Sequence, residues 1–462
     1  MKLHRIPALL LSGAAAGFVA TAAGTEPRAM DGGNWAQWRG PLHTGEATRG
    51  NPPLEWSEDK NIRWKVEVPG LGKSTPVVWN DLVFVTTAVP VETPGAPAAT
   101  PAPAPVDPPP ASAPEGGRRA GGPPPPAPKP GNLEYVVQAH NRSDGKLRWR
   151  KVVKVQAPHE GTHKDGSFAS GSALTDGERV YAFFGSRGLF ALDLKGNLVW
   201  EKQFGAMRTR LSFGEGASPV LHGNALVVNW DHEDQDFLVA LDKKTGKEIW
   251  RTERDEPTSW STPIVVTHGG REQVIVNATN RVRGYDLATG KPLWEAGGMT
   301  ANVIPSPVHA DGTVYVTSGF RGNALLAVRL AEAQGDVTGK GAIAWSYDRD
   351  TPYVPSPLLY KGGLYFLKTN SAVLTRIDVA TGKPDYTQRL EGLSNVYASP
   401  VAVGGRIYVL SREGVTMVLE AGPALKVLAT NKLADGYDAS PAIVGDEMYL
   451  RGPKYLYRIS KD

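Results

Sequence analysis

The sequence repeats one short pattern along most of its length, with a period of about 45 residues. Each repeat has an apolar run, an Asp, a turn that contains Gly, and a second run that usually ends in Trp. The clearest copies are FALDLKGNLVW (190–200), VALDKKTGKEIW (239–250), RGYDLATGKPLWE (283–295) and TRIDVATGKPDYT (375–387). Asp can accept hydrogen bonds from a turn backbone and Gly adopts positive φ, so the pattern predicts two antiparallel strands joined by a tight hairpin.

A second element precedes each hairpin. It is a short Ser/Thr-Pro step followed by an apolar run, as in STPVVW (74–79), ASPVLH (217–222), STPIVV (261–266), PSPVHA (305–310), PSPLLY (355–360), ASPVAV (398–403) and ASPAIV (439–444), while FASGSAL (168–174) lacks the proline. A turn and another strand follow, for example TVYVTS (313–318). Each unit therefore has four short strands, A to D, which is typical of a β-propeller blade. Proline cannot donate to a ladder, so strand A is expected to be the inner strand facing the central channel.

Counting strand A gives eight units, and the last one lacks a strand D. It begins at Ala439 and ends with KYLYRIS (454–460), its third strand. The stretch NIRWKVEV (61–68) precedes the first strand A and carries Trp64 at the matching place. The sequence thus predicts an all-β fold over residues 34–462: an eight-bladed β-propeller of four-stranded antiparallel blades, closed by an N-terminal strand. The periodic tryptophans are expected to wedge between blades; they are Trp149, Trp200, Trp250, Trp294 and Trp345.

Two segments fall outside the repeat. Residues 1–22 have a charged start, an apolar stretch and an Ala-Thr-Ala site at 20–22, which predicts a cleaved signal peptide and a periplasmic or secreted protein. The alternative is a membrane anchor, for which the apolar stretch is short. Residues 89–131 are dominated by Pro, Ala and Gly and are expected to be a disordered loop inserted in blade one. This loop is either a tolerated surface insertion or a tether of polyproline type.

Charge and cysteine content limit the function. Lys and Arg total 51 against 47 for Asp and Glu, a formal net charge of +4, and no basic run is interleaved with aromatics. We therefore expect no nucleic-acid partner. Cysteine is absent, which removes disulfides and thiolate metal sites.

The stretch HEGTH (159–163) matches the H-E-x-x-H pattern of zinc metalloproteases. That chemistry requires both histidines on one face of a helix so that they reach one zinc ion. Pro158 precedes the stretch, Gly161 lies inside it, and the surrounding pattern is that of strands. We therefore expect a surface loop between blades one and two rather than a protease site.

One face of the predicted ring carries the longer loops. D–A and B–C connections emerge on that face, and they are richer in charge and aromatic residues than the tight A–B and C–D turns. Loops held by a rigid frame are the usual place for function. The candidate ligand-binding residues on this loop-rich face are Arg208, Arg210, Trp260, Arg321, Tyr353, Arg412 and Arg451. The arginines either hold an anion or a carboxylated partner, or are ordinary surface and inter-blade pairs.

Histidines and acids also gather in two neighbouring loops. His159 and His163 lie in the loop before blade two, and Asp231 and His232 lie in the B–C loop of blade three. Their nitrogen and oxygen atoms suit a divalent metal. The alternative is a pair of solvated polar loops.

The repeat A-x-D-x-x-T-G-K-x-x-W, seen from Ala240 to Trp250, resembles the tryptophan-docking repeat of pyrroloquinoline-quinone (PQQ)-type propellers. The resemblance covers about Asn34 to Asp462. It implies a relation to quinoprotein alcohol dehydrogenases and to the propeller lipoprotein of the outer-membrane assembly machine. The dehydrogenases hold their quinone beneath a ring of two adjacent cysteines, and the lipoprotein is anchored through a cysteine; this chain has neither. A repeat identifies a fold rather than an activity.

The leading hypothesis is therefore an exported, monomeric propeller that binds a protein or cell-envelope ligand through its loop-rich face and requires no cofactor. A PQQ-dependent oxidoreductase and a divalent-metal-binding propeller are the two alternatives. No catalytic residue is assigned.

Overall fold

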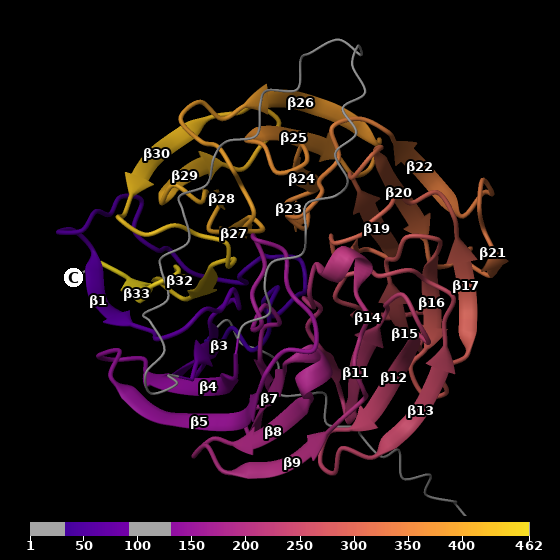
Figure 1. Ribbon diagram of the computed structural model, residues 1–462. Helices are drawn as coiled ribbons and strands as arrows, with labels where there is room; N and C mark the ends of the chain where they lie inside the picture. The colour runs from indigo at the N-terminus through magenta and orange to yellow at the C-terminus, as the bar shows by residue number, and fades with distance from the viewer. Residues whose placement is uncertain (1–32, 92–130, 462) are drawn as a thin grey trace, which may run out of the picture.

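A ring of eight sheets forms the molecule (Figure 1). The computed structural model describes residues 33–91 and 131–461; the expected signal peptide and most of the Pro-rich insertion lie outside these residues. The described part contains 33 strands and two short 3-10 helices, η1 (Gly185–Arg187) and η2 (Arg210–Ser212). The predicted all-β, eight-bladed propeller is confirmed.

Each blade runs from an inner to an outer strand. Blade one comprises β2 (Val77–Trp79), β3 (Leu82–Pro90), β4 (Leu133–Asn141) and β5 (Leu147–Gln156), and blade two comprises β6 (Leu174–Thr175), β7 (Arg179–Phe183), β8 (Leu189–Asp193) and β9 (Leu198–Lys202). Blade three comprises β10 (Val220–His222), β11 (Ala225–Trp230), β12 (Phe237–Asp242) and β13 (Glu248–Glu253), and blade four comprises β14 (Ile264–His268), β15 (Arg271–Val276), β16 (Val282–Asp286) and β17 (Pro292–Ala296). Blade five comprises β18 (Val308–Ala310), β19 (Thr313–Ser318), β20 (Ala324–Arg329) and β22 (Ile343–Tyr347), and blade six comprises β23 (Leu358–Tyr360), β24 (Gly363–Leu367), β25 (Val373–Asp378) and β26 (Lys383–Arg389). Blade seven comprises β27 (Val401–Val403), β28 (Arg406–Leu410), β29 (Val415–Glu420) and β30 (Val427–Lys432), and blade eight comprises β31 (Ala442–Val444), β32 (Glu447–Arg451), β33 (Tyr455–Ile459) and β1 (Ile62–Glu67).

The N-terminal strand closes the ring as predicted. β1 pairs antiparallel with β33 and becomes the outer strand of blade eight. Trp64 in β1 lies beside Tyr449 of the same blade, and its indole Nε1 donates to the carbonyl of Arg142 in blade one. The first and last parts of the chain thus share one sheet, which leaves no open edge at the junction.

Three local details differ from the prediction. The Ser/Thr-Pro step ends just before the inner strand, which begins at Val77 in blade one and Val220 in blade three. Val89 lies within β3 and pairs with Glu134, so the insertion begins later than expected. Blade four has a fifth strand, because β21 (Gly335–Asp336) pairs parallel with β17.

The tryptophans at the outer strands lock neighbouring blades together. Trp149 donates to Leu194 O, Trp200 to Lys243 O, Trp250 to Leu287 O and Trp345 to Val379 O, each in the C–D turn of the next blade. The turn glycine lies directly on each indole, so a side chain there would collide with the ring. Trp294 differs: it is fully buried and donates to Gln273 in its own blade, where β21 covers the outer edge.

The Ser/Thr steps form a second set of links, around the central channel. A backbone N–H in each of blades one to seven donates to a hydroxyl of the next blade, at 2.9–3.0 Å, and the residues involved are Thr75, Ser172, Ser218, Thr262, Ser306, Ser356, Ser399 and Ser440. We call these eight residues the hydroxyl ring. Seven hydrogen bonds join it; within the described residues none connects Ser440 to Thr75, and Thr75 Oγ1 is buried without a partner.

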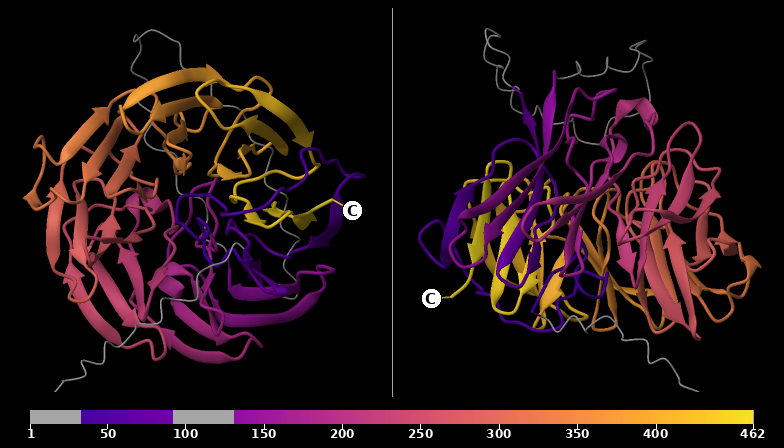
Figure 2. Two further views of the ribbon diagram at one scale, coloured as in Figure 1. Left: turned by 180° about the vertical axis from the view of Figure 1, so that it is seen from behind. Right: turned by 90° about the horizontal axis from the view of Figure 1, so that it is seen from below.

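The N-terminal segment before β1 crosses the channel beneath this ring (Figure 2, indigo). Trp35 bridges to Val78 in blade one, Thr44 O accepts from Leu359 N in blade six, and Ala47 N donates to Ala402 O in blade seven. The buried guanidinium of Arg39 donates to the carbonyls of Pro357 and Pro400. Asn51 then contacts Asp446 in an A–B turn, which places the segment toward the tight-turn face. The channel is therefore closed from that side and open toward the loop-rich face.

Candidate functional site

A cavity of about 390 Å³ occupies the centre of the loop-rich face. Its lining comes from the D–A connections of all eight blades, together with Trp38 of the N-terminal segment and Phe320 of a B–C loop. In every blade the residue two positions before the hydroxyl-ring member lines the cavity: Lys73, Ser170, Gly216, Trp260, Ile304, Val354, Tyr397 and Asp438. The blades thus contribute to one shared site at equivalent positions.

Aromatic rings form much of the cavity wall. Phe320 and Tyr353 stack with ring centroids 4.8 Å apart, and Phe213 lies 6.5 Å from Trp260. Trp260 Nε1 donates to Gly214 O at 2.7 Å, which fixes the indole. Such walls favour an apolar or planar ligand group. Two of the predicted ligand-face residues, Trp260 and Tyr353, therefore lie in this cavity.

Charged side chains gather on the opposite side of the cavity, where Lys73, Asp165 and Asp438 line it and Arg412 contacts the two carboxylates from outside the lining. Lys73 Nζ is 2.8 Å from Asp438 Oδ2, and the guanidinium of Arg412 contacts both Asp438 and Asp165, the latter at 2.7 Å. Arg412 also lies 3.5 Å above the ring of Tyr397. Partial burial acts to raise the pKa of Asp165, but the hydrogen bond and charge of Arg412 outweigh it and hold that pKa below its usual value. The two cations and two carboxylates neutralise one another.

A smaller cavity of about 40 Å³ adjoins the first. Glu215 lines both, and its carboxylate accepts from the Ser186 backbone N–H at 2.7 Å and from the Ser186 hydroxyl. Burial raises the pKa of Glu215, against the opposing effect of the Ser186 hydrogen bonds. His159 lies beside it between Arg187 and Met207 O. Arg187 donates to Nδ1, so Nε2 carries the proton that is donated to Met207 O.

HEGTH forms a loop, as predicted, and its residues hold a neighbouring loop in place. Residues 159–163 contain no helical turn. The Glu160 carboxylate accepts from the backbone and hydroxyl of Thr209, and His163 N donates to Phe213 O at 3.0 Å. The stretch therefore positions Phe213, one of the aromatic walls, and lacks the helix that a zinc protease needs.

The four predicted metal ligands are engaged separately. His159 is held by Arg187, His163 lies 3.5 Å from Asp165, and His232 accepts from the Asp234 backbone. Asp231 is fully buried against Arg254, 2.6 Å away. In the part of the chain that is described, no three His, Cys, Asp or Glu residues gather as a metal site. A shared metal site stays a prediction of the sequence.

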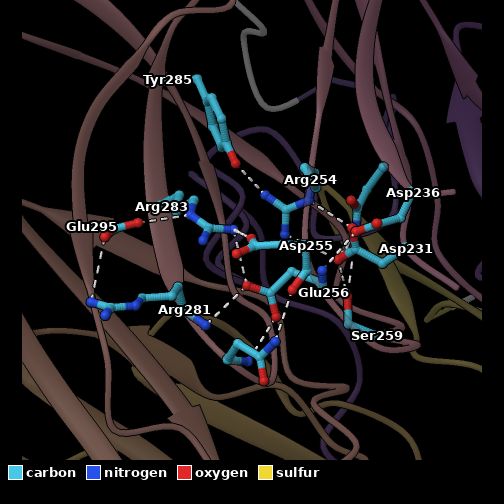
Figure 3. A network of polar contacts seen from close by, with 12 residues as sticks. Asp231, Asp236, Arg254, Asp255, Glu256, Ser259, Arg281, Arg283, Tyr285 and Glu295 are labelled. Atoms are coloured by element: carbon cyan, nitrogen blue, oxygen red, sulfur yellow. Dashed lines mark hydrogen bonds and ion pairs between the residues drawn. The ribbon is translucent and has the colours of Figure 1, made fainter. Parts of the chain in front are cut away.

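Asp231 belongs instead to a polar network that joins blades three and four (Figure 3). Arg254 donates to Asp231 and to the Tyr285 hydroxyl in blade four. Glu256 accepts from the backbone of Asn280 and from Arg283. Burial raises the pKa of Glu256 to about 7, despite the nearby charge of Arg254, and raises that of Asp236 to about 6.

None of the five predicted arginines lines the cavity itself. Arg208 is exposed and paired with Asp234, Arg210 starts η2, and Arg321 is exposed with its guanidinium 5.4 Å from the Phe320 ring. Arg451 is only 1% exposed, because β32 directs it against Thr86 of blade one. It is therefore not a surface ligand of the loop-rich face, and burial lowers its pKa to about 10.

Several cavity residues escaped the sequence analysis, notably Trp38, Lys73, Phe213, Tyr397 and Asp438. A signal for three of them was present. Lys73, Tyr397 and Asp438 each stand two places before a hydroxyl-ring member, in register with Trp260. An alignment of the eight Ser/Thr steps on the hydroxyl-ring residue would have identified these cavity-lining positions.

Comparison with known proteins agrees with the fold. The family model described as outer membrane protein assembly factor BamB matches residues 47–231, 207–334 and 235–462. The chain belongs to this family. It is a PQQ-like β-propeller related to BamB.

Individual relatives of this BamB-type propeller are distant. Tetrathionate hydrolase from Acidithiobacillus ferrooxidans is 23% identical over 59% of this chain and 53% of its own. BamB from Yersinia pestis is 25% identical over 40% of this chain and 49% of its own. The chain spans about half the length of these curated relatives. A solved europium-containing methanol dehydrogenase superposes with a TM-score of 0.62 at 10% identity, covering 93% of this chain and 98% of that one, which shows the shared fold.

The cavity residues fit a PQQ-type quinone poorly. That cofactor carries several carboxylates, whereas Lys73 and Arg412 are already matched by Asp438 and Asp165. The chain has no cysteine for a covering disulfide ring.

Within the described residues no helix has the length and apolarity to cross a membrane.

Proposed function

We propose that this BamB-type propeller is a binding scaffold that works in the periplasm or outside the cell as a monomer. It would hold a protein or cell-envelope ligand at its loop-rich face. The observation that carries this proposal is the aromatic-walled cavity to which all eight blades contribute at equivalent positions. A rigid ring with one central cavity suits recognition of a projecting group, because little conformational entropy is lost on binding.

The arrangement supports binding more than catalysis. The charged side chains of Lys73, Arg412, Asp165 and Asp438 are neutralised within their own cluster, and the pocket wall opposite is apolar. An apolar or aromatic side chain of a partner would bury its surface against Trp260 and Tyr353. Fully burying such a group contributes about 1.5–3 kcal/mol.

Site-specific photo-crosslinking tests this function. A photoreactive residue is placed at Tyr353, in the cavity, and separately at Lys244, in a C–D turn on the tight-turn face. We expect an envelope protein or glycan to crosslink from position 353 and not from 244. Trp260→Ala should reduce that crosslink about tenfold, while the exposed outer-strand variant Leu198→Ala should leave it unchanged. Equal crosslinking from both faces would contradict the proposal.

The oxidoreductase alternative has its own test. The purified protein is titrated with PQQ and Ca²⁺ while the quinone absorbance is recorded. Stoichiometric uptake together with dye reduction would replace the scaffold proposal with a redox function.

A further inference from the structure

The floor of the cavity holds hydrogen-bond donors that nothing in the described protein uses. Five members of the hydroxyl ring line the cavity: Ser172, Ser218, Thr262, Ser399 and Ser440. Each oxygen accepts one backbone N–H from the preceding blade at 2.9–3.0 Å. Within the described residues none of these hydroxyls donates a hydrogen bond, so each keeps a free O–H.

These hydroxyls are deeply buried. Ser172 is 2% exposed, Ser399 is 3% exposed and Ser440 is 4% exposed. A buried donor without an acceptor is costly, so such groups normally have a partner. Each oxygen accepts one inter-blade bond and keeps a second lone pair, while its O–H has no partner among the described residues and requires an acceptor. The ring thus presents a converging set of donors to whatever enters the cavity.

The charges that the described residues place around the cavity offer no free cation, so the hydroxyl donors themselves select the ligand group. Lys73 and Arg412 are balanced by Asp438 and Asp165. Arg451 is an additional buried cation: it makes a single side-chain hydrogen bond, to Thr86 O, and its Nε and Nη2 lack partners. A Cβ added at Gly72, the neighbour of Lys73, would lie 3.0 Å from Arg451 Nη2. Arg451 therefore lies close to the wall that carries Lys73, and the carboxylate of Asp435 offsets part of its charge.

We infer that the hydroxyl ring is a binding site for a single carboxylate whose attached apolar or aromatic group rests on the Trp260 and Tyr353 walls. A carboxylate has about four lone-pair sites, which suits several converging donors. The shared chemistry is that of a polypeptide C-terminus with an apolar last residue, or of a small aromatic acid. This inference rests on the proposed binding function and names the group that is bound.

Calorimetric titration with paired probes tests the site. The probes are a short peptide that ends in phenylalanine with a free carboxylate, the same peptide with a C-terminal amide, and N-acetylphenylalanine. We expect the free acid to bind about tenfold or more tightly than the amide, because hydrogen bonds to charged groups are the stronger ones. Comparable affinity of N-acetylphenylalanine would indicate a small acid as the ligand; clearly weaker affinity would indicate a peptide end.

The ring supplies its own matched controls. Ser218→Ala and Ser399→Ala remove a cavity-lining hydroxyl, whereas Ser306→Ala and Ser356→Ala remove the same inter-blade bond at ring positions outside the cavity lining. We expect the first pair to weaken acid binding roughly tenfold and the second pair to change it less than about twofold. A purely structural ring would make all four variants alike.

The outcomes separate this inference from the proposed function. If acid and amide bind equally and both are lost in Trp260→Ala, the cavity binds ligands but the hydroxyl ring is not a carboxylate site. If no probe binds while crosslinking from position 353 persists, the carboxylate site is overturned and the scaffold function stands. If no probe binds and no partner crosslinks from position 353, both the carboxylate site and the scaffold function are overturned.

Discussion

The junction between blades three and four and the junction between blades eight and one both bury an arginine, with opposite surroundings. Arg254 at the first junction contacts Asp231 at 2.6 Å and the Tyr285 hydroxyl, and both ionic side chains are 0% exposed. Arg451 at the second junction has one hydrogen bond and no ion pair within the described residues. The hydroxyl ring repeats this contrast, because it is continuous at the first junction and interrupted at the second.

The difference separates polar groups that build the fold from polar groups that remain available. At the first junction every charged side chain of the network has a partner, so the network serves to stabilise the fold. At the second, where β1 closes the ring, Arg451 and Thr75 keep polar atoms without a hydrogen-bond partner among the described residues, and Asp435 offsets the charge of Arg451 only in part. Buried unpaired groups of this kind usually mark a functional site or an absent partner.

Removing the two arginines should have unequal effects. Arg254→Met should lower the free energy of unfolding by about 3–5 kcal/mol, because it leaves Asp231 buried and uncompensated. Arg451→Met should change it by less than about 1 kcal/mol or increase it, because it removes a buried cation that makes one hydrogen bond and no ion pair in the described residues. Urea denaturation measures both. Similar losses for the two variants would show that Arg451 has a structural partner in solution.

The paired junction should also respond to pH through Glu256. Its folded pKa of about 7 lies above its usual value of 4.5, so the folded state binds more protons between these values. The unfolding free energy should therefore decrease as pH rises from 5 to 8, by about 1–3 kcal/mol for this group. Glu256→Gln should abolish that contribution.

The readout is the difference between wild type and variant in thermal melting at pH 5, 6.5 and 8. The wild-type curve alone is not sufficient, since a histidine with a lowered pKa acts oppositely; partial burial lowers the pKa of His43 to about 4. A difference that stays constant over this range would show that Glu256 remains ionised throughout.

The smallest effect concerns the hydroxyl ring itself. Ser306→Ala removes an acceptor and leaves Thr262 N–H unsatisfied, so we expect a loss of about 1–2 kcal/mol. Thr75→Val removes a hydroxyl that has no partner and should be neutral within about 0.5 kcal/mol. Denaturant midpoints of the two variants measure the contrast. Equal destabilisation would mean that Thr75 Oγ1 completes the ring in solution.

Periodic features were predictable from the sequence. The Asp-Thr-Gly-Lys turns, the Ser/Thr-Pro steps and the outer tryptophans recur in register, and each sets a local geometry that does not depend on distant residues. They gave the blade count, the strand pattern and closure through NIRWKVEV (61–68), as well as the loop character of HEGTH. Trp260 and Tyr353 were found because the longer loops had to share one face.

The pairing of charges could not be read in the same way. Asp231 resembled a metal ligand and Arg451 a surface cation, yet one is neutralised by Arg254 and the other is buried against blade one. Arg412 was expected on the loop-rich face, but its partners Asp165 and Asp438 lie 247 and 26 residues away in sequence. Such contacts depend on how whole blades dock against each other.

The sequence by itself determined a closed ring of eight blades, since short-range turn chemistry and strand alternation repeat often enough to specify each unit. Only the tertiary structure decided what the ring encloses. The channel is closed by residues 34–51, its floor is a ring of hydroxyls whose donors are free, and its wall alternates between aromatic rings and a neutralised ion cluster. The physical reason is that closure brings one residue from each blade to a common centre, where burial and charge balance depend on all eight together.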